Sequence, residues 1–175
     1  RCGKWGTGSE VRGEPGVPRG PCGKVAGAAQ VHRYRAASPT VALHIPGDRV
    51  DDYAKLGAHA ADLGVEVGTI NANVFQDDDY MLGGLCHPTP AVRRKALDHV
   101  DECSASMNAT GSRDLKIGLA EGTNYPGQGD LRGRQDRLHE SLAEVYAKLT
   151  GEQRLVLEYK FFEPAFYATD VPDWG

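Results

Sequence analysis

The sequence predicts an α/β fold in which a parallel sheet forms part of a (β/α)8 barrel. Short apolar segments alternate with amphipathic segments in the order strand, helix, strand, helix, strand, helix, strand. This alternation is typical of a parallel sheet with right-handed crossovers, which occurs both in doubly wound sheets and in barrels. A complete barrel needs roughly 250 residues and eight strands. The 175 residues therefore predict a partial TIM barrel, about its first four β/α units.

Residues 1–23 are rich in Gly and Pro and predict an irregular lead-in, which leaves residues 24–175 for the half barrel. An Ala-rich stretch, residues 24–34, predicts a short helix. The apolar residues 41–45 predict the first strand, which ends at Pro46. Asp48 is expected to cap the helix that follows.

The second helix carries apolar residues at helical spacing from Val50 to Leu63, and the second strand is expected over residues 65–75. Thr89 followed by Pro90 is a strong helix start, and Gly111 is the expected end of that third helix.

The third strand is expected over residues 115–120. Asp130 is expected to open the fourth helix, which Gly151 ends, and residues 154–160 predict the fourth strand.

An open half barrel would leave its inward-facing apolar side chains without the layers that oppose them. We expect those side chains to be Val41, Leu43, Val67, Ile117 and Val156. The isolated chain is therefore expected to be marginally stable or prone to aggregation.

Composition limits the class of protein. The chain has 24 acidic and 20 basic residues, a net charge of −4, and 40% hydrophobic residues, which is typical of a globular protein. No apolar run approaches the roughly 20 residues of a membrane span, and the slight acidity gives no general attraction to nucleic acid. We expect a cytoplasmic protein that binds neither membrane nor nucleic acid.

Glu158 and Lys160 alternate on the fourth strand, so their side chains share one face. A carboxylate beside a lysine near the carboxyl end of a barrel strand fits a metal ligand with an adjacent cation for a developing oxyanion. The same two residues could equally form a structural ion pair.

His87 follows the second strand and is a candidate general acid or base, with a surface or helix-entry histidine as the alternative. His44 lies within the first strand and is expected in the core. The acidic loop 77–79 has no Gly or Glu at calcium-loop spacing and predicts a solvated loop. Solvated helix faces are expected for the remaining histidines, His32, His59, His99 and His139.

Four long stretches resemble the L-rhamnose isomerase family of bacterial sugar isomerases, within the xylose-isomerase-like TIM barrels. The strongest runs over residues 157–175, from Leu-Glu-Tyr-Lys-Phe-Phe-Glu-Pro to Asp-Val-Pro-Asp-Trp-Gly. The others are residues 122–128 with 134–138, residues 73–80, and residues 109–116. The resemblance extends from about Lys24 to the last residue and covers the N-terminal half of the family's barrel.

The resemblance implies an aldose–ketose isomerase that acts on L-rhamnose and related aldoses with a divalent metal such as Mn²⁺. It implies that Glu158 is a metal ligand, that Lys160 polarises or protonates sugar oxygens, and that His87 assists sugar binding and ring opening. It also implies a homo-oligomer in the full-length family.

The chain departs from the family pattern in several places. The family's other metal ligands follow the fourth strand, so the fragment is expected to be inactive alone. Gly47 and Gly118 stand where aromatic residues are usual, and Glu121 stands where aspartate is usual. Two alternatives stay open: a non-catalytic half barrel that self-associates, and another metal-dependent barrel enzyme such as a sugar epimerase or a nuclease.

Overall fold

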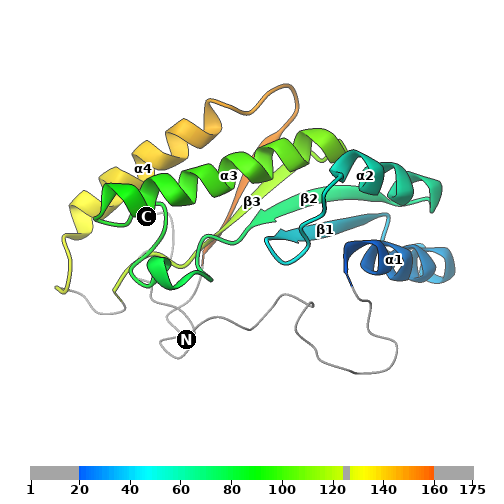
Figure 1. Cartoon of the computed structure of the whole chain (residues 1–175), viewed down its shortest axis with the longest axis horizontal. Coiled ribbons are helices and arrows are strands. Elements are labelled where there is room, and N and C mark those ends of the chain that lie inside the picture. Colours follow the sequence, from blue (N-terminus) through cyan, green and yellow to red (C-terminus); the bar gives the residue numbers. More distant parts are fainter. Residues whose placement is uncertain (1–19, 124–126, 160–175) are drawn as a thin grey trace.

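The computed structural model describes residues 20–123 and 127–159, which form a parallel sheet with helices packed against it (Figure 1). The elements follow one another in this order: α1 (Pro21–Arg35), β1 (Thr40–Ile45), α2 (Tyr53–Asp62), β2 (Glu66–Ala72), η1 (Asp78–Tyr80), α3 (Pro90–Thr110), β3 (Asp114–Leu119), α4 (Leu131–Tyr146) and β4 (Arg154–Tyr159).

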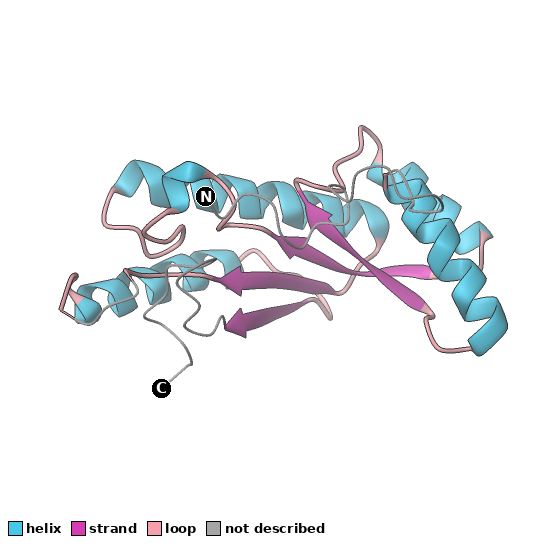
Figure 2. Ribbon diagram, turned by 90° about the horizontal axis from the view of Figure 1, so that it is seen from below, coloured by secondary structure: helices cyan, strands magenta, loops and turns pink. Residues whose placement is uncertain are grey.

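The strand order separates the two architectures that the alternation allows. The four strands pair in the order β1-β2-β3-β4, and every pair is parallel. A doubly wound sheet reverses its strand order at a switch point, whereas a barrel adds each new strand to the same side. The described sheet keeps the barrel order, and its strands fan out with a strong twist (Figure 2).

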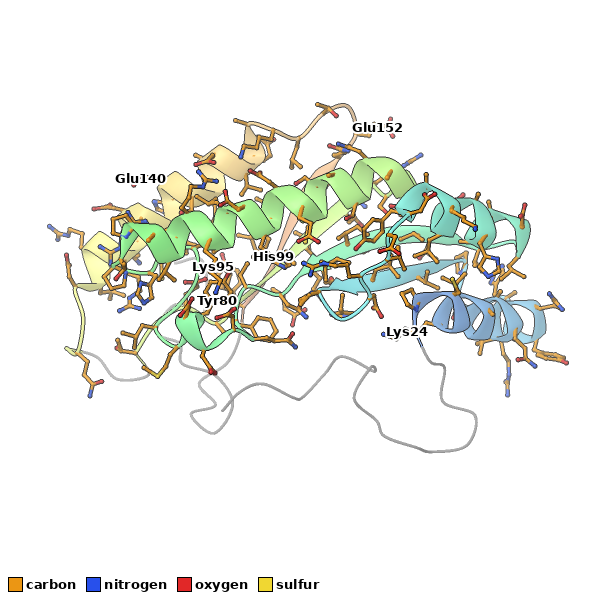
Figure 3. All side chains as sticks on the ribbon, in the orientation of Figure 1. Lys24, Tyr80, Lys95, His99, Glu140 and Glu152 are labelled. Atoms are coloured by element: carbon orange, nitrogen blue, oxygen red, sulfur yellow. The ribbon has the colours of Figure 1, made fainter. Side chains whose placement is uncertain are left out.

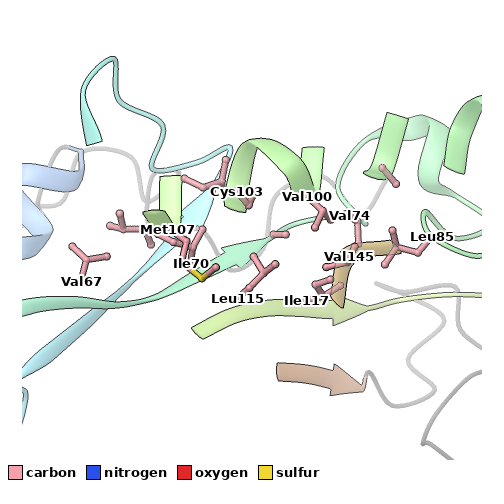
Figure 4. Packing of buried hydrophobic residues seen from close by; sticks show 14 of the residues in the cluster. Val67, Ile70, Val74, Leu85, Val100, Cys103, Met107, Leu115, Ile117 and Val145 are labelled. Atoms are coloured by element: carbon pink, nitrogen blue, oxygen red, sulfur yellow. The ribbon is translucent and has the colours of Figure 1, made fainter. Parts of the chain in front are cut away.

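One face of the sheet forms the core. Leu43, Ile70 and Leu115 are neighbours in the register, and each is at most 1% exposed. Ile70 and Leu115 pack beneath α3 together with Val100 and Met107 (Figure 4). Because successive side chains of a strand point to opposite faces, this apolar row places the intervening residues on the open face. Figure 1 shows α3 and α4 on the helical side of the sheet, with α1 beside β1 and α2.

Most of the side chains expected to face the barrel interior face the helices instead. Leu43, Val67 and Ile117 are buried in the core, and Val41 packs against the same cluster. Only Val156 lies on the open face, where it is 38% exposed. Among the described residues, the helices supply apolar partners to one face of the sheet, so the apolar member of each alternating pair turns toward them.

Two expected helix starts are wrong. α1 begins at Pro21, so residues 21–23 are helical rather than part of the lead-in, and residues 1–19 lie outside the described part. Asp52, not Asp48, caps α2 by accepting a hydrogen bond from the Lys55 amide. Asp48 is buried, where it pairs with Lys24.

The predicted third helix is confirmed as α3, with Gly111 in the left-handed region at φ 75°. β2 is shorter than the expected 65–75. Lys160, expected at the end of the fourth strand, lies outside the described residues. None of the helices in the described part combines the length and apolar composition that a membrane span requires.

Because helices cover only one of the two faces in the described part, truncating a side chain should lower the free energy of unfolding more on that face than on the open face. Ile117→Ala should lower the free energy of unfolding by about 2–5 kcal/mol, because it leaves a cavity in a side of the sheet covered by helices. Val156→Ala, on the open face, should cost about 1 kcal/mol or less. Urea midpoints of the two variants measure the difference; equal losses would mean that the open face is also covered in solution.

Candidate functional site

A row of polar side chains crosses the open face of the sheet. His44, Asn71 and Lys116 occupy paired positions on β1, β2 and β3. The Asn71 amide nitrogen lies 3.1 Å from His44 Nε2. Asn71 is only 6% exposed, and its Oδ1 has no hydrogen-bond partner among the described residues. The open face therefore presents a buried acceptor that a hydroxyl donor could satisfy.

Glu158 lies on the same face, beside Gly118 of β3 in the register. Its carboxylate forms an ion pair with Lys116, and both side chains are about one-third exposed. The cation beside Glu158 in the described part is therefore a lysine of the neighbouring strand. The expected companion, Lys160, lies outside the described residues.

The sequence analysis places His44 in the core, and this prediction is wrong. The side chain is half-buried and lies on the open face. Burial lowers the pKa of its imidazole, and the positive charges of Lys24 and Lys116 act in the same direction, while Asp48 opposes them. Its backbone amide donates to Asp48 Oδ2 at 2.9 Å. Strand alternation placed this histidine, because Leu43 and Ile45 on either side of it fill the core.

His87 lies between β2 and α3 and is half-buried. The Thr89 amide donates to His87 Nδ1 at 3.0 Å, which assigns the proton of the neutral ring to Nε2. Burial is the main cause that lowers the pKa of this histidine. At neutral pH, His87 is therefore a hydrogen-bond donor through Nε2.

Glu121 follows β3 and is fully buried against the segment that carries His87. Its carboxylate oxygens accept hydrogen bonds from the amides of Leu85 and Cys86, each at 3.1 Å, and from the Cys86 thiol at 2.8 Å. Burial raises the pKa of that thiol, so Cys86 acts as a donor and not as a nucleophile. A side chain at Gly83 would place its Cβ 2.3 Å from Glu121 Oε2, so this close approach requires glycine.

The acidic loop is exposed, and two of its three carboxylates pair with a lysine. Asp77 and Asp79 both bind Lys95 Nζ, at 2.8 and 2.7 Å, and Lys95 lies 5.5 Å from the Tyr80 ring (Figure 3). The solvated loop that the sequence predicts is thus confirmed, with an ion pair to α3. A cavity of about 280 Å³ lies beside it.

His99 lines this cavity. The prediction that it lies on a solvated helix face is wrong. Its side chain is 13% exposed, and its Nε2 lies 3.1 Å from the carbonyl oxygen of Ile45. The ring therefore links α3 to the end of β1.

Residues 20–123 and 127–159 contain no group of three or more His, Cys, Asp or Glu side chains that could hold a metal ion. The described residues therefore do not fit a complete metal centre. Glu158 could serve only as one ligand among others.

Sequence reasoning missed Asn71 and Lys116, although a signal was present. Both stand between apolar residues that share the opposite face, as Lys116 does between Leu115 and Ile117. A polar residue at such a position of a barrel strand is expected on the inner face. Glu121 gave no comparable signal, because nothing in a turn sequence shows which amides a carboxylate will meet.

Two curated relatives are similar in sequence to most of this chain. No family model matches. A probable sugar isomerase of Rhizobium meliloti (strain 1021) is 38% identical over 166 residues, which are 92% of this chain and 39% of the relative. A probable sugar isomerase of Mesorhizobium japonicum is 35% identical over 165 residues, 91% of this chain and 38% of the relative. The chain thus spans about two-fifths of these relatives.

Solved structures show the same fold at low sequence identity. An L-ribulose 3-epimerase matches 83% of this chain and 46% of its own, with a TM-score of 0.58 and 18% identity. A family 2 AP endonuclease from Brucella melitensis matches 79% of this chain and 49% of its own, with a TM-score of 0.57 and 17% identity. The described chain has the fold of part of a TIM barrel.

The lowered pKa of His44 predicts that acid destabilises the chain. Below about pH 6.5 the unfolded chain takes up a proton at this residue before the folded chain does, so the free energy of unfolding falls as the pH drops from 7 to 5. In His44→Gln that fall should be smaller.

Urea titrations at pH 8 and pH 5 test this prediction. The difference between variant and parent at pH 8 reports lost contacts alone, because His44 is neutral in both states there. An identical pH dependence in the two proteins would contradict the prediction. His87, whose pKa is also lowered, contributes to the fall that remains.

Proposed function

We propose that this chain is the N-terminal part of a divalent-metal-dependent aldose–ketose isomerase that acts on L-rhamnose or a related aldose. The observation that carries the proposal is the 38% identity to a probable sugar isomerase over 92% of the chain. The polar open face at the carboxyl half of the sheet supports it, because barrel enzymes bind their substrates at that end.

The reaction moves a hydrogen from C2 of the open-chain aldose to C1, while the proton of the C2 hydroxyl is lost and the C1 oxygen gains one. Glu158 would be one ligand of a divalent metal, in our proposal Mn²⁺, which polarises the sugar oxygens when bound. Further ligands must come from outside the described residues, which contain no group of three or more metal-ligating side chains.

His87 is suited to ring opening. Its neutral ring carries the proton on Nε2 and can donate a hydrogen bond to a sugar oxygen, and its lowered pKa keeps the ring neutral at physiological pH. Lys160, if it shares the face of Glu158 as strand alternation predicts, would stabilise negative charge on the same oxygens.

His44 and Asn71 suit recognition of hydroxyl groups. The unpartnered Asn71 Oδ1 can accept from a sugar hydroxyl, and the amide nitrogen already holds His44 in place. Without a bound hydroxyl group, the buried Asn71 Oδ1 would have no hydrogen bond to offset the cost of its desolvation.

A sugar epimerase is the second candidate function. It is favoured by the fold shared with L-ribulose 3-epimerase and with the D-psicose 3-epimerase of Clostridium cellulolyticum H10, which was solved with D-tagatose and has a TM-score of 0.51. Both candidates need a polarised sugar oxygen and a proton carrier. A cytoplasmic location and a homo-oligomer belong to the proposal in either case.

The test is conversion of L-rhamnose to its ketose by the longer protein that carries this chain, with added Mn²⁺. Glu158→Gln should lower kcat/KM at least about 100-fold, because a neutral amide replaces a charged metal ligand. Glu152→Gln is the matched control: it removes an exposed carboxylate paired at the surface with Arg113, and should leave activity within about twofold.

Epimerisation of a ketose at C3 without aldose–ketose conversion would favour the second candidate. Neither reaction, with Mn²⁺ binding unaffected by Glu158→Gln, would overturn both.

A further inference from the structure

The backbone of residues 82–87 is held by side chains from three directions. Glu121 follows β3, and its carboxylate accepts hydrogen bonds from the amides of Leu85 and Cys86. From α4, Ser141 Oγ donates to the Leu85 carbonyl at 2.7 Å, and Arg137 Nε donates to the Cys86 carbonyl at 2.9 Å.

The third direction is α3, the helix that follows. Arg93 Nη1 donates to the carbonyl oxygen of His87 at 2.6 Å. The amides and carbonyls of Leu85 and Cys86, and the carbonyl of His87, are thus paired with side chains of Glu121 and of two helices. The remaining donor, the His87 amide, donates to the Gly84 carbonyl at 3.4 Å. A loop whose peptide groups are all hydrogen-bonded has little conformational freedom, because any local opening must break several of these bonds.

We propose that Glu121 is a positioning residue that fixes the His87 imidazole in one orientation for the sugar. The catalytic consequence rests on the proposed function, while the structural part does not. Glu121 has no exposed surface, and its two oxygens meet three donors within one turn of backbone. A buried carboxylate is retained only where such bonds offset its desolvation.

Glu121 also acts on His87 through its charge. The carboxylate favours the protonated ring and so raises the pKa of His87. Burial has the larger effect and lowers this pKa, and the positive charges of Arg93 and Arg134 lower it less. On the α3 side Thr89 donates to the ring itself. Removal of the carboxylate therefore changes both the geometry and the electrostatics at His87, which a packing role alone would not do.

The experiment is nitrogen NMR of the 175-residue chain with labelled histidine, with His87 assigned through His87→Gln. The parent should show a single tautomer with the proton on Nε2. In Glu121→Gln the ring should populate both tautomers, and its pKa should fall by about half a unit, the effect expected of one charge at a distance of several ångströms in a partly solvated site.

Two milder variants keep the test informative if Glu121→Gln does not fold. Glu121→Asp retains the charge but is one methylene shorter, so the pKa of His87 should stay near the parent value while the Leu85 and Cys86 amides exchange at least about tenfold faster. Ser141→Ala should also accelerate that amide exchange, since it removes the hydrogen bond to the Leu85 carbonyl without changing any charge. Glu140→Gln, an exposed carboxylate of α4, is the control that should change neither signal.

A folded Glu121→Gln chain with the parent's tautomer and pKa at His87 would overturn the proposal. If that variant does not fold, parent-like amide exchange in both Glu121→Asp and Ser141→Ala would overturn it equally. These readouts need neither sugar nor metal, so they stand if the isomerase assignment fails. In an active longer protein, Glu121→Asp should lower kcat about tenfold and change KM less than threefold.

Discussion

One-sided burial of a parallel sheet is the constraint on which the rest of this structure depends. The helices cover one face, so Leu115 and Ile117 turn toward them and are fully buried. Because successive side chains of a strand point to opposite faces, Lys116, which lies between them, points to the open face. Because parallel pairing aligns Lys116 with Asn71 and His44, the polar row arises from the same register that builds the core.

The polar row is stable because its members pair with one another. Asn71 holds His44, and Lys116 neutralises Glu158 on the next strand. The ion pair is about one-third exposed, so water screens it and its net contribution to stability is small. Its consequence is chemical: the chain keeps a carboxylate, a cation and an imidazole together on the open face.

A second, independent arrangement holds the segment before α3. The start of α3 has a local explanation: Pro90 lies in its first turn, and Thr89 occupies the N-cap position, although its side chain makes no capping hydrogen bond. These local features do not explain why the chain before α3 adopts one conformation. That order comes from Glu121, which follows β3, and from two side chains of α4. The candidate acid His87 is thus oriented by residues more than 30 positions away in sequence.

The alternation of strands and helices, the two ends of α3 and the exposed acidic loop could be predicted from the sequence, because they depend on periodicity and on residues such as Pro90 and Gly111 that act locally. The sequence pointed to Glu158 through strand alternation, but assigned Val41, Leu43, Val67 and Ile117 to the wrong face.

Three features could not be predicted from local patterns: which face the helices cover, the pairing of Asp48 with Lys24 in place of a cap on α2, and the hydrogen bonds from the amides before His87 to Glu121. These are contacts between elements far apart in the chain, and a local pattern carries no information about which distant group will fill a given position.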